Sequence, residues 1–183
     1  VRKVSIIPRG HALGVTFQSP ETERYGYSST YLKGRIVGAL GGRAAEDLVF
    51  SDFTTGAESD LETVTRIARQ MVGRWGMSPE VGPITVLPAP GQEQPVFDGS
   101  GPSPATRELV DSEVRHIVDE CYAEALDTLR EHRTNLDRLA KRLLEAETLN
   151  EQEAREAAGL VDQSPRSVLP QRGQWAREQT SRS

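Results

Sequence analysis

The chain has 183 residues, of which 36% are hydrophobic and 5% aromatic, and its formal net charge is −5. This length suits one domain with a real core and is too short for two comfortable ones. The acidic balance excludes a broad basic surface for nucleic acid, so we expect no nucleic-acid partner.

The first seventeen residues have the pattern of two short β-strands. An apolar run at 4–7 precedes a Pro-Arg-Gly turn, and residues 13–17 alternate apolar side chains with small or polar ones. The chain begins with Val1 rather than Met, which suggests a piece of a longer protein. No apolar run approaches the roughly 18 residues that span a bilayer, so we expect the chain itself to be soluble.

A helix is predicted from about Ser29 to Phe50, because Leu, Ile and Ala recur on one face at helical spacing. Gly38, Gly41 and Gly42 lower its intrinsic stability, each by up to about 1 kcal/mol relative to alanine. Glycines inside a helix usually permit a neighbouring backbone to approach closely. We therefore expect a close contact at these three positions.

The next helix carries the residue of greatest chemical interest, Asp60. Apolar residues recur at spacings of three and four from Leu61 to Trp75, where the helix is expected to end near Gly76. At roughly 100° per residue, Asp60 lies within about 60° of the centre of this stripe. An unpaired buried carboxylate costs several kcal/mol, so an inward Asp60 needs an amide, a cation or a metal as its partner.

Two capping boxes compete at the start of this helix. With Thr55 as N-cap, Asp60 lies inside the helix and points at the core. With Ser59 as N-cap, Asp60 is a first-turn acid that complements the helix dipole. The residues alone favour the second arrangement, since acids are common at helix starts.

Residues 82–104 hold six of the eleven prolines and are expected to form a long loop. Ser103-Pro104 then predicts a helix start, with serine as the cap and proline in the first turn, and this helix should run to about Arg130. Cys121 lies in its apolar phase and is expected in the core. As the single cysteine, it also excludes an internal disulfide.

The last part of the chain predicts two more helices. Thr134 or Asn135 is expected to cap the first, and a capping box at 150–153 opens a short second one that ends at Leu160. Residues 161–183 are rich in Ser, Gln and Arg and predict a disordered tail. The elements together predict a mainly α domain over residues 1–160, with a small β-sheet near the N-terminus.

Other candidate metal ligands carry weaker signals. His11, His116 and His132 are not spaced for ligation from one helical turn, and each is expected on the surface. Glu46 flanks the apolar stripe of its helix and is expected at a packing edge. The sequence has no Gly-x-Ser-x-Gly elbow, no Walker A motif and no Rossmann fingerprint.

Six short blocks of sequence then occur in a recognisable order. They are Ser5–Gly10, Ala12–Thr16, Leu40–Glu46, Thr54–Ala57 with Asp60-Leu61, Ala68–Val72 and Gly76–Ser78. Together they resemble the peptidase domain of FtsH, the membrane-anchored, ATP-dependent AAA+ zinc metalloprotease. The likeness continues to about Leu160 and omits the proline-rich loop and the tail.

The resemblance implies a helical metallopeptidase domain whose zinc is held by two histidines of an H-E-x-x-H helix and by one aspartate from a later helix. Asp60 matches that aspartate, which makes it the expected third zinc ligand and favours Thr55 as the cap. The H-E-x-x-H helix, with the general-base glutamate, would lie upstream of Val1. We therefore expect no catalytic residue in this chain, and we expect the fragment alone to be inactive.

The resemblance also implies properties of a parent protein. That parent would be a homo-hexameric metalloendopeptidase at the cytoplasmic face of the cell membrane, using Zn²⁺ and ATP to degrade unfolded or membrane proteins in protein quality control. Residues 4–7 or 12–17 would present a sheet edge that aligns substrate as an added strand, or both runs would simply form the core of the small sheet. Two other classes stay open: a non-catalytic, ring-forming module of an AAA+ assembly, and a generic helical adaptor.

Overall fold

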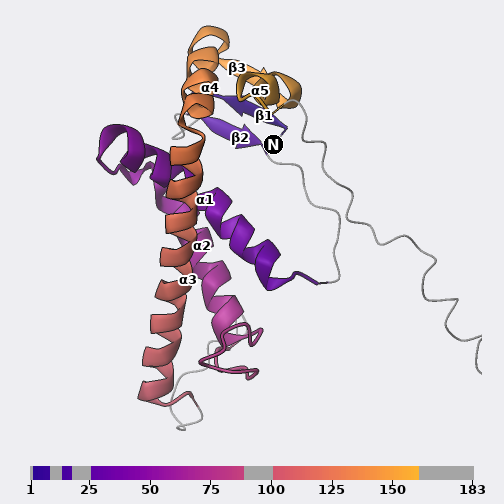
Figure 1. Ribbon diagram of the computed structural model, residues 1–183. Coiled ribbons are helices and arrows are strands. Elements are labelled where there is room, and N and C mark those ends of the chain that lie inside the picture. Colours follow the sequence, from indigo (N-terminus) through magenta and orange to yellow (C-terminus); the bar gives the residue numbers. More distant parts are fainter. Residues whose placement is uncertain (1, 9–13, 18–25, 89–100, 161–183) are drawn as a thin grey trace, which may run out of the picture.

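The computed structural model describes residues 2–8, 14–17, 26–88 and 101–160. Three helices form an elongated body: α1 (Ser29–Phe50), α2 (Glu58–Gly73) and α3 (Pro104–Glu131) (Figure 1). A one-turn 3₁₀ helix, η1 (Thr55–Ala57), joins the first two. The apolar stripes of the three helices face one another, which makes one continuous core. Its fully or nearly fully buried members are Leu32, Ile36, Leu40, Ala44, Val64, Ile67, Ala68, Met71, Val72, Val81, Val110, Ile117, Cys121 and Ala125.

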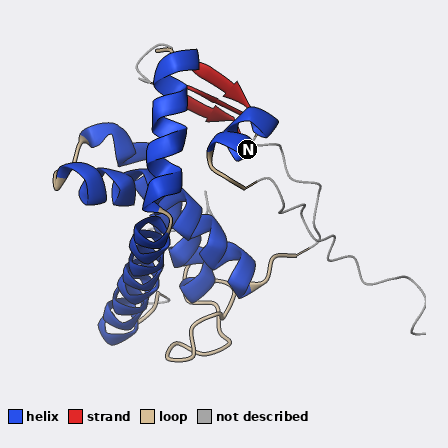
Figure 2. Cartoon of the chain, turned by 45° about the horizontal axis from the view of Figure 1, so that its top comes forward, coloured by secondary structure: helices blue, strands red, loops and turns tan. Residues whose placement is uncertain are grey.

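The remaining elements form what we call the head, at one end of the body (Figure 2). It consists of β1 (Lys3–Ser5), β2 (Val15–Phe17), α4 (Arg133–Ala146), β3 (Thr148–Asn150) and α5 (Glu151–Ala157). The three strands are antiparallel in the order β2-β1-β3. The central strand therefore has both of its edges paired.

The head is joined to the body where α3 passes into α4 at His132. Arg133 lies at this junction, where its guanidinium donates to the Leu48 carbonyl at 3.5 Å and to the Asp137 carboxylate at 2.9 Å. The Leu48 carbonyl belongs to the last turn of α1, which leaves such groups without intrahelical donors. Arg133 thus fastens the start of α4 to the end of α1.

Local capping signals set most helix boundaries. Ser28 accepts from the Tyr31 amide at the start of α1, and Ser103 accepts from the Thr106 amide at the start of α3. Asn150 and Glu153 form the predicted reciprocal capping box of α5. The predicted cap of α4 is wrong: its N-cap is His132, without a side-chain hydrogen bond, because α4 continues almost directly from α3.

The expected close approach at the glycines of α1 is also wrong. A Cβ added to Gly38, Gly41 or Gly42 would meet no described atom within 4 Å outside the helix's own nearby backbone. The close contacts occur at the end of α2 instead. There the Gly73 carbonyl accepts from the amides of Val86 and Leu87, and a Cβ on Gly73 would collide with the Leu87 side chain.

Several sequence predictions fall wholly or partly outside the described residues. These are the Pro-Arg-Gly turn at 8–10, His11, the loop segment 89–100 and the tail 161–183. Within the part of the chain that the structure describes, no helix is both long and apolar enough to cross a membrane.

Candidate metal centre

Asp60 lies in the first turn of α2, and its side chain is exposed. The expectation that it points into the core is therefore wrong. Its angular position is that of the buried face, close to Val64 and Ile67. Burial, however, also needs a neighbour that packs over the same turn, and no described element does so. Asp60 is a first-turn acid that complements the helix dipole, the role favoured by the residue pattern alone.

The chain enters α2 through a turn held by Thr54 and Glu46. The Thr54 hydroxyl donates to Glu46 Oε1 at 2.8 Å and accepts from the Gly56 amide at 3.3 Å. The Thr54 amide also reaches Glu46 Oε2 at 3.4 Å. Neither Thr55 nor Ser59 is the cap, because η1 precedes α2 and the N-cap of α2 is Ala57.

This turn fixes the position of Asp60 relative to α1. Glu46 is half-buried and both of its oxygens are used by Thr54, so it acts as a packing-edge acid rather than as an open ligand. The predicted caps were Thr55 and Ser59, so the capping role of Thr54 was not predicted. The signal that identifies it is a hydroxyl residue directly before Thr-Gly at a helix start, within reach of an acid eight residues upstream.

The described residues do not make a zinc site by themselves. Within them, no group of three or more His, Cys, Asp or Glu side chains is placed to hold a metal ion. Catalytic zinc sites use three protein ligands and one open position. Asp60 forms no hydrogen bond or ion pair with any described residue, so no described group occupies its carboxylate.

The histidines do not join Asp60. His116 is exposed on α3 and lies 3.2 Å from the Glu120 carboxylate. His132 is exposed at the junction of α3 and α4. Both positions agree with the expectation of surface histidines.

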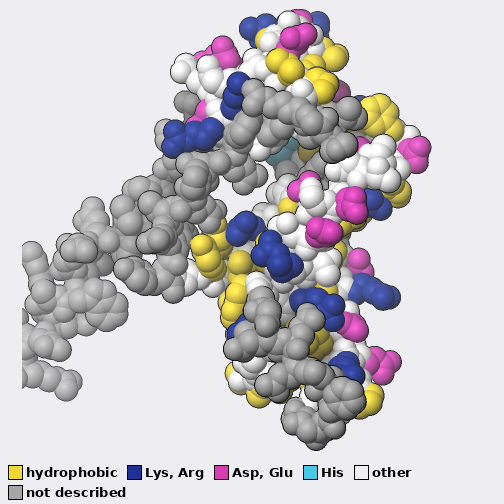
Figure 3. All heavy atoms as spheres, turned by 180° about the vertical axis from the view of Figure 1, so that it is seen from behind, with side chains coloured by type: hydrophobic (Ala, Val, Ile, Leu, Met, Phe, Trp, Pro, Cys, Tyr) yellow, Lys and Arg dark blue, Asp and Glu magenta, His cyan; other side chains and the backbone are white. Residues whose placement is uncertain are grey.

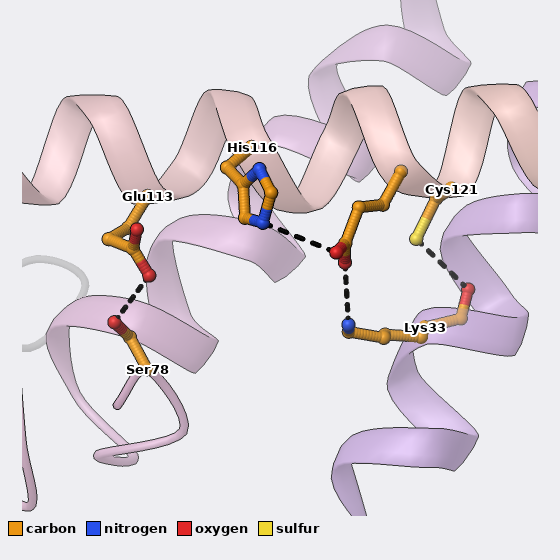
Figure 4. A network of polar contacts seen from close by, with 6 residues as sticks. Lys33, Ser78, Glu113, His116 and Cys121 are labelled. Carbon is orange, nitrogen blue, oxygen red and sulfur yellow. Dashed lines mark hydrogen bonds and ion pairs between the residues drawn. The ribbon is translucent and has the colours of Figure 1, made fainter. Parts of the chain in front are cut away.

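A second polar cluster ties α3 to α1 (Figure 4). The Lys33 ammonium donates to Glu120 at 2.8 Å, which raises the pKa of Lys33 and lowers the pKa of Glu120. The Cys121 thiol donates to the Lys33 carbonyl at 3.8 Å, and burial raises its pKa. Cys121 is buried in the core, as expected, and a thiol with a raised pKa is a poor nucleophile.

The same seam continues toward the segment that follows α2. The Ser78 hydroxyl is buried and donates to Glu113 of α3 at 2.7 Å, while it accepts from the Val81 amide (Figure 4). Each polar group in this cluster has a partner within the cluster. We conclude that it joins elements and does not form a reactive centre.

Comparisons with known proteins identify the family of this chain. A family model described as peptidase family M41 matches residues 1–157. The whole chain is 56% identical to the ATP-dependent zinc metalloprotease FtsH 3 of Conexibacter woesei, of which it covers 24%. Across 90% of its length it is 56% identical to the ATP-dependent zinc metalloprotease FtsH of Thermobaculum terrenum, of which it covers 26%.

A more distant relative gives the same match. The chain is 41% identical across 96% of its length to the ATP-dependent zinc metalloprotease FtsH of Rubrobacter xylanophilus, of which it covers 27%. The chain therefore spans about a quarter of the length of these three relatives.

Proposed function

The chain belongs to peptidase family M41, and from that premise we propose that it is part of the peptidase domain of an ATP-dependent zinc metalloendopeptidase. The observation that carries this proposal is the match over residues 1–157, together with 56% identity to a zinc metalloprotease along the whole chain. The orientation of Asp60 does not support this proposal, because its side chain is exposed. The proposed domain extends over residues 1–160.

In this proposal Asp60 supplies one carboxylate ligand to the metal. Zinc bound there would polarise the scissile carbonyl and lower the pKa of a bound water toward neutrality. Asp60 adds negative charge and helps to fix the coordination geometry. Glu46 and Thr54 act as positioning residues, since their hydrogen bonds set where the first turn of α2 begins. The remaining ligands and the general base come from outside the described residues.

Two strands, β2 and β3, have an outer edge in the sheet, and only β2 belongs to the runs predicted to align substrate. Of the two runs considered, residues 4–7 are unsuitable because β1 is paired on both sides, by β2 and β3. In the sheet, β2 is paired only with β1, so its other edge is the one that an extended polypeptide would use. Main-chain pairing of this kind reads little side-chain information, which suits an enzyme that degrades many proteins.

The parent protein would be a homo-hexamer at the cytoplasmic face of the cell membrane, and it would use ATP to drive unfolded or membrane proteins to the peptidase site. The names of the relatives support the use of ATP and zinc, and the hexamer and the membrane location rest on the resemblance alone. The specific substrates would be set elsewhere in that protein.

For the chain taken alone, a non-catalytic structural role is the second candidate. The observation that favours it is the lack of a complete group of metal-ligating side chains among the described residues. One carboxylate does not bind zinc tightly, so an isolated chain would contribute packing surfaces and no hydrolysis.

The experiment that tests the proposal uses the full-length parent protein and its Asp60→Ala variant. We expect the parent to contain about one zinc per subunit and to hydrolyse casein with ATP. Asp60→Ala should lose most of the metal and bring hydrolysis to background, because the third ligand is missing. Metal content is measured by mass spectrometry after dialysis.

Asp119→Asn is the control, because Asp119 is an equally exposed carboxylate on α3 and makes no ion pair with a described residue. It should leave zinc and activity unchanged. Full retention of zinc by Asp60→Ala would show that another residue is the ligand. A parent that assembles but neither binds zinc nor cleaves casein would support the structural role instead.

A further inference from the structure

The outer face of α2, turned away from the core, is hollowed into a groove of about 1040 Å³. Thr54 and Thr55 close one end of the groove, and Leu87 and Pro88 close the other. Seen from behind, Lys and Arg side chains gather over the middle of the body (Figure 3). The outer face of a surface helix is normally polar, and this groove has apolar as well as polar lining residues.

Three arginines crowd the end of the groove that lies nearer the C-terminus of α2. Arg66 is exposed and forms no ion pair with any described residue. Arg69 has one exposed partner, Asp111, at 3.2 Å. Arg74 is half-buried, and its Nε is buried without a hydrogen-bond partner in the described structure. The arginine side chains give this end of the groove a positive charge.

The other end of the groove has the opposite charge. Glu58 and Glu62 line it beside the two threonines. An entirely acidic ligand lying along the whole groove would meet repulsion from these two carboxylates. The acidic part of any ligand must therefore lie at the arginine end, against Leu87 and Pro88, whose side chains provide an apolar wall.

We propose that this groove binds a short acidic segment of another polypeptide, with its carboxylates on Arg66, Arg69 and Arg74 and one apolar side chain against Leu87 and Pro88. Arginine suits this task because its planar fork can bind carboxylates through two parallel hydrogen bonds. The aliphatic stems of the arginines add apolar contact area beside the wall.

The size of the groove favours a peptide over a second copy of this chain. Twelve described residues line it, whereas a stable protein interface uses about 20–30 residues on each side. A groove along a helix of sixteen residues, roughly 24 Å long, spans about seven residues of extended peptide. The proposal does not depend on the metal or on peptidase activity.

The test measures binding of a fluorescent twelve-residue peptide, in which one Leu is flanked by Asp and Glu, to the 183-residue chain by fluorescence anisotropy. We expect saturable binding that weakens several-fold between 50 and 300 mM salt, because the charges are partly exposed. Arg66→Glu should raise Kd by about ten-fold or more, since it replaces an attraction with a repulsion. A peptide with Lys in place of Asp and Glu should not bind.

Arg115→Glu is the matched control, because Arg115 is exposed on α3, lies outside the groove and undergoes the same change in charge. It should change Kd less than about two-fold. Arg74→Gln tests the half-buried arginine, with a thermal melt to confirm that the variant folds, and should also weaken binding.

Three outcomes would overturn the proposal. The first is no binding of the acidic peptide at millimolar concentration. The second is an equal loss of affinity in Arg66→Glu and Arg115→Glu, which would reduce the effect to net charge. The third is concentration-dependent association of the chain that Arg66→Glu abolishes without any peptide binding, which would make a second copy the occupant.

Discussion

The body and the head are held together by different forces. Fourteen buried hydrophobic residues from the body form one cluster. In the described head, only Leu143, Leu149 and Ala158 reach comparable burial, and Leu149 alone has a relative exposure of 0%. Burial of a large apolar side chain contributes about 1.5–3 kcal/mol. Side-chain packing therefore involves many residues in the body and only a few in the described head.

Hydrogen bonds carry more of the stability of the head. Strand β1 pairs on both sides, the Ile6 amide donates to the Glu147 carbonyl at 2.9 Å, and the hydroxyls of Ser5 and Thr148 lie 2.8 Å apart. Each such bond has a net worth of only about 0.5–1.5 kcal/mol. We expect the head to open locally before the body unfolds.

The largest predicted effect is on the body. Met71→Ala should lower the free energy of unfolding by about 2–5 kcal/mol, because Met71 is fully buried between the three helices and truncation leaves a cavity. Cys121 lies in the same core, so its thiol should react faster with a disulfide reagent in this variant. An unchanged rate of thiol modification and an unchanged unfolding midpoint would contradict the prediction.

The corresponding change in the head is Leu149→Ala. It should cost about 2–4 kcal/mol locally, seen as faster amide hydrogen exchange in residues 148–157. The rate of Cys121 modification should stay at the value of the unmodified chain, since the body core does not include Leu149. If Leu149→Ala accelerates Cys121 modification as much as Met71→Ala does, the head and the body unfold as one unit.

Elements set by nearby residues could be predicted from the sequence, and elements set by distant partners could not. The bounds of α1, the start of α3 and the capping box of α5 depend on residues within one or two turns, so local patterns identify them. Strand β3 was not predicted because it has three residues and exists through pairing with β1, with Asn150 opposite Lys3. No pattern within three residues encodes a partner that lies nearly the whole chain away.

The expected inward orientation of Asp60 is wrong for a related reason. The spacing of the apolar residues gives the correct position of Asp60 around the axis of α2. Its exposure, however, depends on which element packs over the first turn of the helix. Thr54 was missed because the 3₁₀ turn η1 separates it from α2, so it caps a different helix from the one predicted. Both errors arise where a local pattern meets an unknown neighbour.

A smaller effect on stability is predicted at two glycines of the body, of which one has free space around it and the other has none. Gly42→Ala should raise the free energy of unfolding by about 0.5–1 kcal/mol, because the exposed Cβ meets no described neighbour outside the helix and alanine favours the helix. Gly73→Ala should lower it by about 1–3 kcal/mol, since the new methyl collides with Leu87. Chemical denaturation of both variants measures the difference, and two changes of the same sign would contradict this reading of α1 and α2.

The smallest predicted effect is the pH dependence of the ion pair that links α1 to α3. Because Lys33 lowers the pKa of Glu120, this pair stabilises the folded state above the unfolded-state pKa of glutamate, about 4.3, and the contribution is lost as pH falls through the lower folded-state pKa. The raised pKa of Lys33 keeps the contribution in place below the ordinary pKa of lysine, about 10.4, and the contribution is lost as pH rises through the folded-state pKa.

The expected result is a small loss of melting temperature in Glu120→Gln at neutral pH that disappears on acidification below about pH 4. Both side chains are partly exposed, so solvent screens the pair and added salt should shrink the difference. Glu108→Gln, which removes an exposed acid without a partner in the described structure, serves as the control and should show no such pH dependence. An equal effect of both variants at every pH would show that packing between α1 and α3 owes nothing to this pair, and that the body is held by its apolar core alone.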